Sequence, residues 1–179
     1  MGGESPMNKV LKTLVLLALA WMLASCATTG DRAAVTPYID GGINFHMKGD
    51  RQLNLYQRAP HALTVCAYQL KDLNAFNQVL EEKDGVTKLM ECSRFDPSVN
   101  FVKRLIVQPG RDLYDAMEVS EGTRHVAIVA GYYNFKKREA VKTVPLPLKG
   151  MPFFKKHAGT DIDVFCGPQE LRILKGGES

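Results

Sequence analysis

An almost uninterrupted apolar run at residues 126–133 is the feature that most constrains how this chain can fold. The run is short, contains β-branched residues such as Val126 and Val129, and is flanked by the charged residues Arg124 and Lys136. A buried helix would need a longer segment, so length and β-branching favour a strand. The run therefore predicts a strand at the centre of a sheet.

Several other segments alternate apolar and polar residues, as Ile43, Phe45 and Met47 do, and this period of two is typical of half-buried strands. Pro109-Gly110 and Gly167-Pro168 each predict a hairpin turn. Pro145 and Pro147 cannot donate ladder hydrogen bonds, which predicts an edge strand for their segment. The expected strands are residues 39–47, 63–68, 101–107, 113–119, 126–133, 141–148, 162–166 and 171–174, with one further short strand considered around Leu53 and Leu55.

Only one region has helical spacing. Leu73, Phe76 and Leu80 lie on one face of a predicted helix that Asp72 can cap, and a second short helix is expected after Asp84. About eight short strands with one helical insertion between the second and third predict an all-β fold, a β-sandwich of two sheets.

The amino terminus has the pattern of an export signal. Lys9 and Lys12 precede an uncharged run at residues 13–23, and small residues then lead to Cys26. The run has about 11 residues, too few for a helix that crosses the hydrocarbon core of a membrane, which needs about 20. We therefore predict that residues 1–25 are removed and that Cys26 is lipidated; the alternative is an ordinary secretory signal with a chance cysteine. Translation starts at Met1 or Met7.

The remainder of the chain divides into a tether and one domain. Residues 26–37 are mostly small and polar, without periodicity, and are interpreted as a lipidated tether to a domain at residues 38–179. Ala27 is not the aspartate of an inner-membrane retention signal, so we expect the outer membrane, facing the periplasm. A net charge of +4 does not favour a nucleic-acid partner.

Three further cysteines, Cys66, Cys92 and Cys166, are expected in an oxidising compartment. We predict a Cys66–Cys92 disulfide, with Cys166 directed into the core because it shares parity with Ile162 and Val164. The alternative is three buried free thiols.

No pattern in the sequence indicates catalysis or a metal site. Phosphate loops, dinucleotide fingerprints and nucleophile elbows are absent from the sequence. Asp161 and Asp163 lie two apart on one expected strand, whereas glycosidase carboxylates flank a substrate from opposite sides. We therefore interpret them as a solvated strand face and predict no enzyme, no cofactor, no metal and no small-molecule substrate. The four histidines are scattered: His46, His61, His125 and His157.

Two basic clusters could contact anionic head groups or an acidic partner, although short charge runs are usually solvated loops. The first is Lys136, Lys137 and Arg138, and the second is Lys155-Lys156.

Two segments resemble a known family. Residues 65–72, Val-Cys-Ala-Tyr-Gln-Leu-Lys-Asp, followed by Ala75-Phe76, are similar to the signature of the TssJ (VasD, Lip) outer-membrane lipoproteins of type VI secretion. Residues 107–110 and 124–132 resemble that family's Pro-Gly turn and valine-rich central strand. With Cys26, the resemblance extends from about residue 23 to about residue 135.

The resemblance implies a transthyretin-like sandwich and a scaffold role, in which the protein tethers the secretion membrane complex by binding the periplasmic carboxy-terminal part of TssM. Family contacts with this partner lie largely on the loop between the first two strands, here residues 48–60. Tyr56 and Arg58 are candidate anchors because aromatic residues and arginine are enriched in hot spots. Alternatively, Leu55 or Tyr56 packs on the sandwich and only the loop tip is free. The candidate partner-binding residues are Lys48, Gly49, Asp50, Arg51, Gln52, Tyr56 and Arg58.

A second functional hypothesis remains: a periplasmic sandwich module that binds an envelope saccharide or peptide. Such a module should have a groove lined by exposed aromatic side chains.

Overall fold

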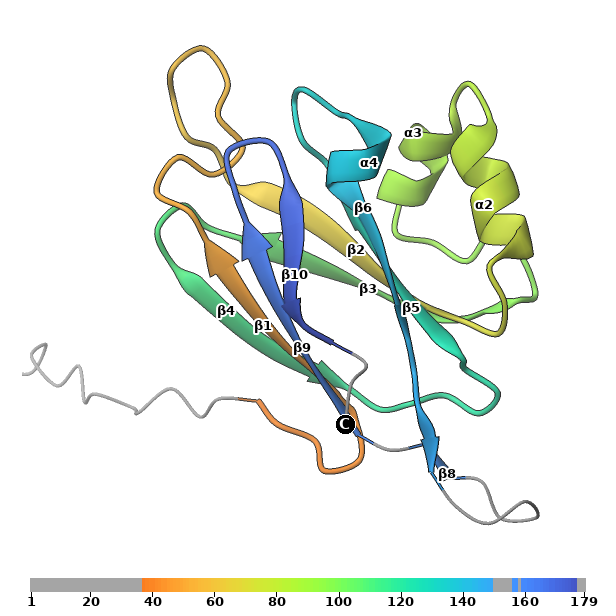
Figure 1. Cartoon of the computed structure of the whole chain (residues 1–179). Helices are drawn as coiled ribbons and strands as arrows, with labels where there is room; N and C mark the ends of the chain where they lie inside the picture. The colour runs from red at the N-terminus through yellow and green to blue at the C-terminus, as the bar shows by residue number, and fades with distance from the viewer. Residues whose placement is uncertain (1–36, 150–155, 158, 177–179) are drawn as a thin grey trace, which may run out of the picture. The chain divides into compact units, whose positions relative to one another are not determined.

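The computed structural model describes residues 37–149, 156–157 and 159–176, and these form two four-stranded sheets packed face to face (Figure 1). The first sheet has the order β10 (Leu171–Lys175), β9 (Thr160–Cys166), β1 (Ile43–Gly49) and β4 (Asp112–Met117). The second has the order β3 (Val99–Val107), β2 (Leu63–Leu70), β5 (His125–Ala130) and β6 (Val141–Pro145). The remaining elements are helices α2 (Asn74–Glu81), α3 (Gly85–Met90) and α4 (Lys137–Ala140), and the short strands β7 (Leu148–Lys149) and β8 (Lys156–His157).

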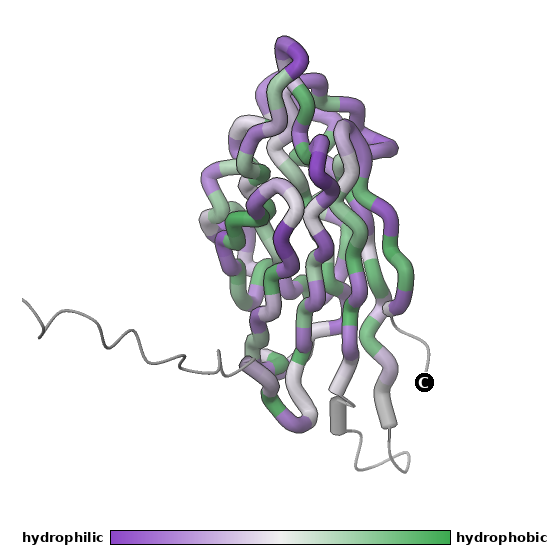
Figure 2. Tube along the Cα trace, turned by 90° about the vertical axis from the view of Figure 1, so that its left-hand side faces the viewer, coloured by the Kyte–Doolittle hydropathy of each residue, from purple (hydrophilic) through white to green (hydrophobic). Residues whose placement is uncertain are grey.

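The core lies between the two sheets and follows the alternation in the sequence. Ile43, Phe45 and Met47 of β1 point into it from one sheet, and Leu63 and Val65 of β2 from the other. Apolar and polar residues alternate along the strands in the hydropathy-coloured trace (Figure 2). The predicted fold, an all-β sandwich with helices inserted between β2 and β3, is confirmed.

β5 is the central strand that the apolar run predicts. It pairs with β2 on one side and with β6 on the other, antiparallel in both cases. β6 lies at the edge of its sheet, where Pro145 needs to donate no ladder hydrogen bond. The predicted final hairpin is also present, since β9 and β10 pair antiparallel around Gly167.

The turn at Pro109-Gly110 does not form the predicted hairpin. β3 pairs with β2, whereas β4 pairs with β1 in the other sheet, so this turn carries the chain across the sandwich. The periodicity was compatible with both arrangements because it reports which face is buried and not which strand is the neighbour.

Three further details are not given by the pattern in the sequence. Phe101 is 42% exposed on the edge strand β3, although it shares parity with the buried residues Leu105 and Val107. Leu174 is 62% exposed near the end of β10. The segment around Leu53 and Leu55, considered as a further short strand, forms no strand, and Leu53 is buried beneath its loop.

Helices α2 and α3 cover the outer face of the second sheet through a smaller apolar cluster that includes Tyr68, Leu70, Phe76 and Leu89. A Cys66–Cys92 disulfide, the predicted pairing, joins β2 to the end of α3. The Tyr68 hydroxyl donates to the carbonyl oxygen of Leu89, and burial raises the pKa of Tyr68 to about 12. This face of the sandwich is therefore fastened by covalent, polar and apolar contacts together.

Asp72 lies one residue before the N-cap position of α2 and not at the N-cap, where it was predicted. Leu73 occupies the N-cap position, and Asp72 instead accepts a hydrogen bond from the backbone N–H of Asn74 at 2.9 Å. The carboxylate still satisfies one of the free donors at the start of the helix.

Within the residues that the structure describes, no helix is both long and apolar enough to cross a membrane.

Candidate partner-binding surface

Four connections meet at one end of the sandwich (Figure 1): the β1–β2 loop, the β3–β4 turn, the β5–α4 loop and the β9–β10 turn. The β1–β2 loop is fastened to two of the others by backbone hydrogen bonds. Asp50 donates to Cys166 at 2.9 Å and accepts from Gly110 at 3.0 Å, while Leu55 donates to Pro168 at 2.9 Å. The loop therefore has a defined conformation and forms one surface with its neighbours.

Asn54 connects this loop to the β5–α4 loop. Its side chain is buried, with Nδ2 donating to the carbonyl oxygen of Ala62 at 3.1 Å and Oδ1 accepting from the backbone N–H of Tyr133 at 3.0 Å. Its φ of 48° lies in the left-handed region, which asparagine enters more readily than most residues. One buried amide thus fixes both the bend of the loop and the position of Tyr133.

Above Asn54, aromatic rings form a small exposed cluster. Tyr56 and Tyr133 stack with ring centroids 4.6 Å apart and planes 19° apart, and the edge of His61 meets Tyr133 at 5.0 Å. Tyr56 is 40% exposed and Tyr133 57% exposed. Exposed but positioned tyrosines are typical of protein interfaces, because their rings offer a large contact area at little entropic cost.

Tyr132 holds the β5–α4 loop against the β9–β10 turn. Its ring is buried and its hydroxyl donates to the carbonyl oxygen of Glu170 at 2.7 Å, in the β9–β10 turn. Burial first, and then the nearby Cys166 and Glu170, raise the pKa of the Tyr132 phenol. The phenol therefore remains a neutral hydrogen-bond donor at physiological pH.

The predicted partner-binding residues fall into two groups. Arg51, Gln52, Tyr56 and Arg58 are exposed at this end of the sandwich. The others have structural positions: Gly49 is the buried last residue of β1, Lys48 is exposed on the outer face of the first sheet, and Asp50 is half-buried with its carboxylate accepting from the backbone N–H of Gln52.

Tyr133 belongs to this surface but is missing from the predicted set. The signal in the sequence is the Tyr132-Tyr133 pair just after the apolar run, which puts one ring inside and one outside. The stacking partner of the outer ring is far away in sequence and cannot be inferred from spacing.

Gly49 is close-packed at the base of the loop. A Cβ atom there would lie 2.4 Å from the carbonyl oxygen of Gln108 and 2.9 Å from that of Arg111, both in the β3–β4 turn. Glycine therefore allows the turn to approach the end of β1 closely enough for the backbone bonds that hold the loop.

Asp161 and Asp163 lie on one exposed strand face, as predicted, and share it with His46. The two ring nitrogens of His46 are 2.9 Å from Asp112 and 3.7 Å from Asp163, and its ring stacks on Tyr114. Asp161 accepts from Asn44 at 3.3 Å. These groups join three neighbouring strands, and no set of three potential metal ligands occurs among the residues described.

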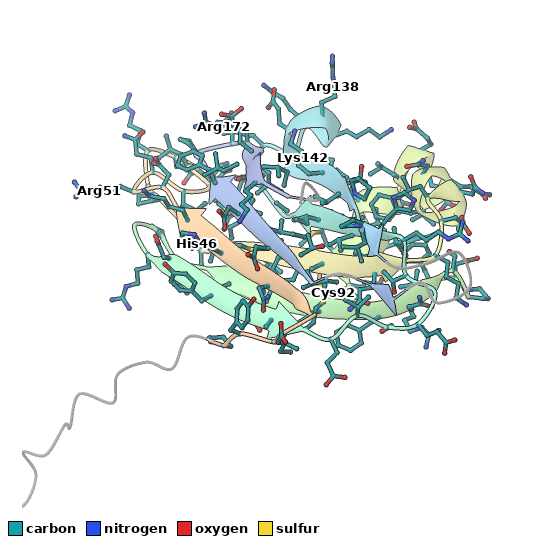
Figure 3. The ribbon with its side chains drawn as sticks, turned by 60° about the horizontal axis from the view of Figure 1, so that its bottom comes forward. His46, Arg51, Cys92, Arg138, Lys142 and Arg172 are labelled. Atoms are coloured by element: carbon teal, nitrogen blue, oxygen red, sulfur yellow. A yellow bond between two sulfur atoms is a disulfide. The ribbon has the colours of Figure 1, made fainter. Side chains whose placement is uncertain are left out.

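The first basic cluster is only partly free. Lys136 pairs with Glu139 at 3.5 Å and Lys137 pairs with Glu81 of α2, whereas Arg138 projects from α4 into solvent (Figure 3). Cys26, Lys155 and the side chains of Lys156 and His157 lie outside what the structure describes.

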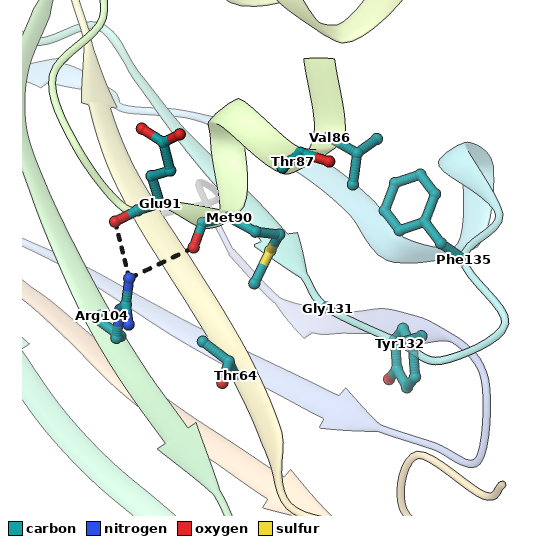
Figure 4. A pocket seen from close by; sticks show the side chains of 9 residues that line it. All are labelled: Thr64, Val86, Thr87, Met90, Glu91, Arg104, Gly131, Tyr132 and Phe135. Carbon is teal, nitrogen blue, oxygen red and sulfur yellow. Dashed lines mark hydrogen bonds between the residues drawn. The ribbon is translucent and has the colours of Figure 1, made fainter. Parts of the chain in front are cut away.

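One hollow on the outer face of the first sheet is lined by exposed Tyr38 and Tyr114, together with Asp161 and Asp163. A second hollow lies beside α3 (Figure 4). Met90 and Phe135 contribute apolar walls, and the Arg104 guanidinium donates to the carbonyl oxygens of Met90 and Glu91 at 3.4 and 2.8 Å. Arg104 thus ties the end of α3 to β3 through one of its terminal nitrogens.

The two-sheet sandwich with a helical insertion defines the fold, and comparison with known proteins identifies the class of protein. The model of the type VI secretion lipoprotein family, described as T6SS-SciN (VasD, EvfM, TssJ, VC_A0113), matches residues 42–165. The chain belongs to this family, which is a family of secretion-system lipoproteins and not of enzymes.

Solved structures agree on the fold. The T6SS lipoprotein TssJ1 from Pseudomonas aeruginosa is 16% identical with a TM-score of 0.62, covering 77% of this chain and 97% of TssJ1. Serratia marcescens Lip, described as a membrane-bound component of the type VI secretion system, is 16% identical with a TM-score of 0.59, covering 75% and 99%. A chain of the structure described as the TssM C-terminal domain from EAEC is 15% identical with a TM-score of 0.54, covering 74% and 97%. No curated protein matches the chain.

Proposed function

We propose that this protein is a structural lipoprotein of the type VI secretion membrane complex, which it anchors to the outer membrane by binding the periplasmic domain of TssM. The main support for the proposal comes from the loop end of the sandwich, the end where the β1–β2, β3–β4, β5–α4 and β9–β10 connections meet. There, exposed Tyr56 and Arg58 lie on a loop that backbone hydrogen bonds hold to its neighbours. A preorganised surface loses little conformational entropy when a partner binds.

The membrane half of the proposal rests on Cys26. Residues 1–25 act as a lipoprotein signal peptide that is removed, Cys26 carries the lipid, and residues 26–37 tether the sandwich at residues 38–179. Because residue 27 is Ala and not the aspartate of an inner-membrane retention signal, the lipid is inserted in the outer membrane and the sandwich faces the periplasm.

The partner half rests on family membership and on one of the similar structures. A chain with this fold occurs in a structure described by the C-terminal domain of TssM, and this protein spans 97% of that chain. The partner that we propose for this protein is the one that the family resemblance implies, the periplasmic carboxy-terminal part of TssM, with no nucleic acid and no small-molecule substrate involved.

The saccharide-binding or peptide-binding alternative is favoured only by the hollow on the first sheet, where exposed Tyr38 and Tyr114 line the wall. The hollow beside α3 does not support it. Among its described lining residues Tyr132 is buried and Phe135 is only partly exposed, so neither ring offers the open stacking platform that this alternative requires.

Binding to TssM tests the proposal directly. The full-length lipoprotein, purified in detergent, should retain the purified periplasmic domain of TssM, and Tyr56→Ala combined with Arg58→Ala should weaken binding by about tenfold or more, the effect of losing hot-spot side chains.

Tyr38→Ala is the matched control, because Tyr38 is 67% exposed but precedes β1 at the other end of that strand. Wild-type protein that does not retain TssM would refute the proposed function, whereas equal weakening by Tyr38→Ala would move the interface away from the loop end.

A further inference from the structure

We infer that the stacked Tyr56–Tyr133 pair is a single aromatic anchor and that the unpaired arginines on its side of the molecule select an acidic patch on a partner protein. The inference rests on the proposed function and deepens it, because it adds a residue outside the β1–β2 loop and specifies the chemistry of the surface that the partner must present.

Tyr133 is held as firmly as Tyr56. Its backbone N–H donates to the buried amide of Asn54, its ring stacks on Tyr56, and the edge of His61 supports it from a third direction. The two tyrosines come from different loops but expose one continuous aromatic surface. Removing either ring therefore takes away the stacking partner of the other, so we treat the pair as one unit.

The charges at this end are unbalanced. Arg51 and Arg58 of the β1–β2 loop, Arg111 of the β3–β4 turn and Arg138 of α4 are exposed and make no ion pair within the described part of the chain. Figure 3 shows Arg51 and Arg138 extended into solvent.

Acidic residues in the same connections are already engaged. Glu170 pairs with Arg172 at 3.2 Å, Glu139 pairs with Lys136, and the Asp50 carboxylate accepts from Gln52 at 2.7 Å. Asp50 keeps its negative charge, but it is half-buried, so the exposed charges without an ion-pair partner at this end are mainly guanidinium groups. The planar donors of a guanidinium match the two oxygens of a carboxylate.

A protein patch fits this surface better than lipid head groups do. The chain enters the sandwich at Tyr38, before β1, and the loops follow the other end of that strand. At about 3.3 Å per residue, the length of β1 separates the two ends by roughly 20 Å. The exposed, stacked rings of Tyr56 and Tyr133 add the large, positioned contact area that is typical of protein interfaces.

Photocrosslinking in cells tests which class of molecule lies against the anchor. Replacement of Tyr133 by the photoreactive p-benzoylphenylalanine in the lipidated protein should give a covalent adduct with TssM, and the same replacement at Tyr38 should not. A lipid adduct at position 133, or no adduct, would overturn the inference, whereas TssM capture by the wild-type protein tests the proposed function separately.

Charge reversal tests the acidic patch. Arg51→Glu with Arg58→Glu should weaken TssM binding by about tenfold or more and flatten its dependence on salt, because complementary charges that are lost no longer respond to screening. Tyr133→Ala should also weaken binding by about tenfold, with the salt dependence unchanged.

The matched control for charge is Arg94→Glu with Arg124→Glu, two exposed arginines outside the loop end that also make no ion pair with described residues. If this control pair weakens binding as much as the loop pair does, or if wild-type binding is independent of salt, the inference fails while TssM binding itself stands. If wild type does not bind TssM, both proposals fail together.

Discussion

Gln69 shows that single residues of the family-like segment at 65–72 serve the fold and not the binding surface. Its side chain is fully buried, its Nε2 donates to the carbonyl oxygen of Glu118 at 2.7 Å, and its Oε1 accepts from the backbone N–H of Ser120 at 2.8 Å and from the Thr123 hydroxyl at 3.1 Å. One amide therefore satisfies three partners in the connection between β4 and β5.

Replacing this amide should be costly. Gln69→Leu keeps a similar volume but removes the acceptor of the buried Thr123 hydroxyl and the partners of the part-buried Glu118 carbonyl and Ser120 N–H. A buried polar group left unsatisfied costs about 1–3 kcal/mol. We expect the free energy of unfolding to fall by about 3 kcal/mol or more, measured by urea denaturation. Gln78→Leu on the exposed face of α2 is the control, and a similarly small loss in both variants would contradict this role for Gln69.

At the scale of elements, α2 and α3 are an insertion whose attachment is concentrated at the end of α3. The disulfide binds Cys92 to Cys66, the Arg104 guanidinium donates to the carbonyl oxygens of Met90 and Glu91, and Phe76 and Leu89 are buried against the sheet. The disulfide is the strongest of these restraints because it also limits the unfolded chain.

Removing the disulfide should destabilise the sandwich without changing its topology. The bond spans a sequence separation of 26 residues, for which loop entropy gives about 3–4 kcal/mol. Cys66→Ala with Cys92→Ala should therefore lower the urea midpoint, and amide hydrogen exchange should increase most in α2 and α3. Reductant should lower the urea midpoint of the wild type but should leave that of this variant unchanged. Equal stability of oxidised and reduced wild-type protein would contradict the prediction.

Periodicity predicted the strands and helices well because the spacing of apolar residues within one segment determines which face of that segment is buried. The strand face of Ile43, Phe45 and Met47 and the helix face of Leu73, Phe76 and Leu80 each follow from spacing within one segment. The crossing at Pro109-Gly110 was mispredicted because a short turn between two strands fits both a hairpin and a change of sheet. Choosing between these requires the partners of β3 and β4, which are distant in sequence.

The candidate site was predicted only in part for the same reason. Tyr56 and Arg58 follow from their position in a polar loop, whereas Tyr133 joins them through stacking and through the Asn54 amide. Loop conformation depends on hydrogen bonds between segments far apart in sequence, such as that from Leu55 to Pro168. Spacing along the chain carries no information about such contacts.

For the whole molecule, the proposed function requires two attachments, one through the lipid and one through the loop end. Separating them experimentally is possible because Cys26 precedes the sandwich in sequence and the partner-binding residues lie within it. A protein that bridges a membrane and a partner should lose assembly when either attachment is removed, while the other attachment continues to work by itself.

Cys26→Ser should therefore move the protein out of the outer-membrane fraction and abolish labelling by radioactive palmitate, while TssM binding by the purified protein remains within about twofold of wild type. The reason is that three acyl chains hold a protein stably, at about 0.8 kcal/mol for each buried methylene, and serine offers no thiol for lipid attachment. Thr29→Ser, a change of similar size in the proposed tether, should leave fractionation unchanged. Retention of the Cys26→Ser protein in washed outer membranes would show that another segment provides the anchor, and a parallel loss of TssM binding would show that the two attachments are not independent.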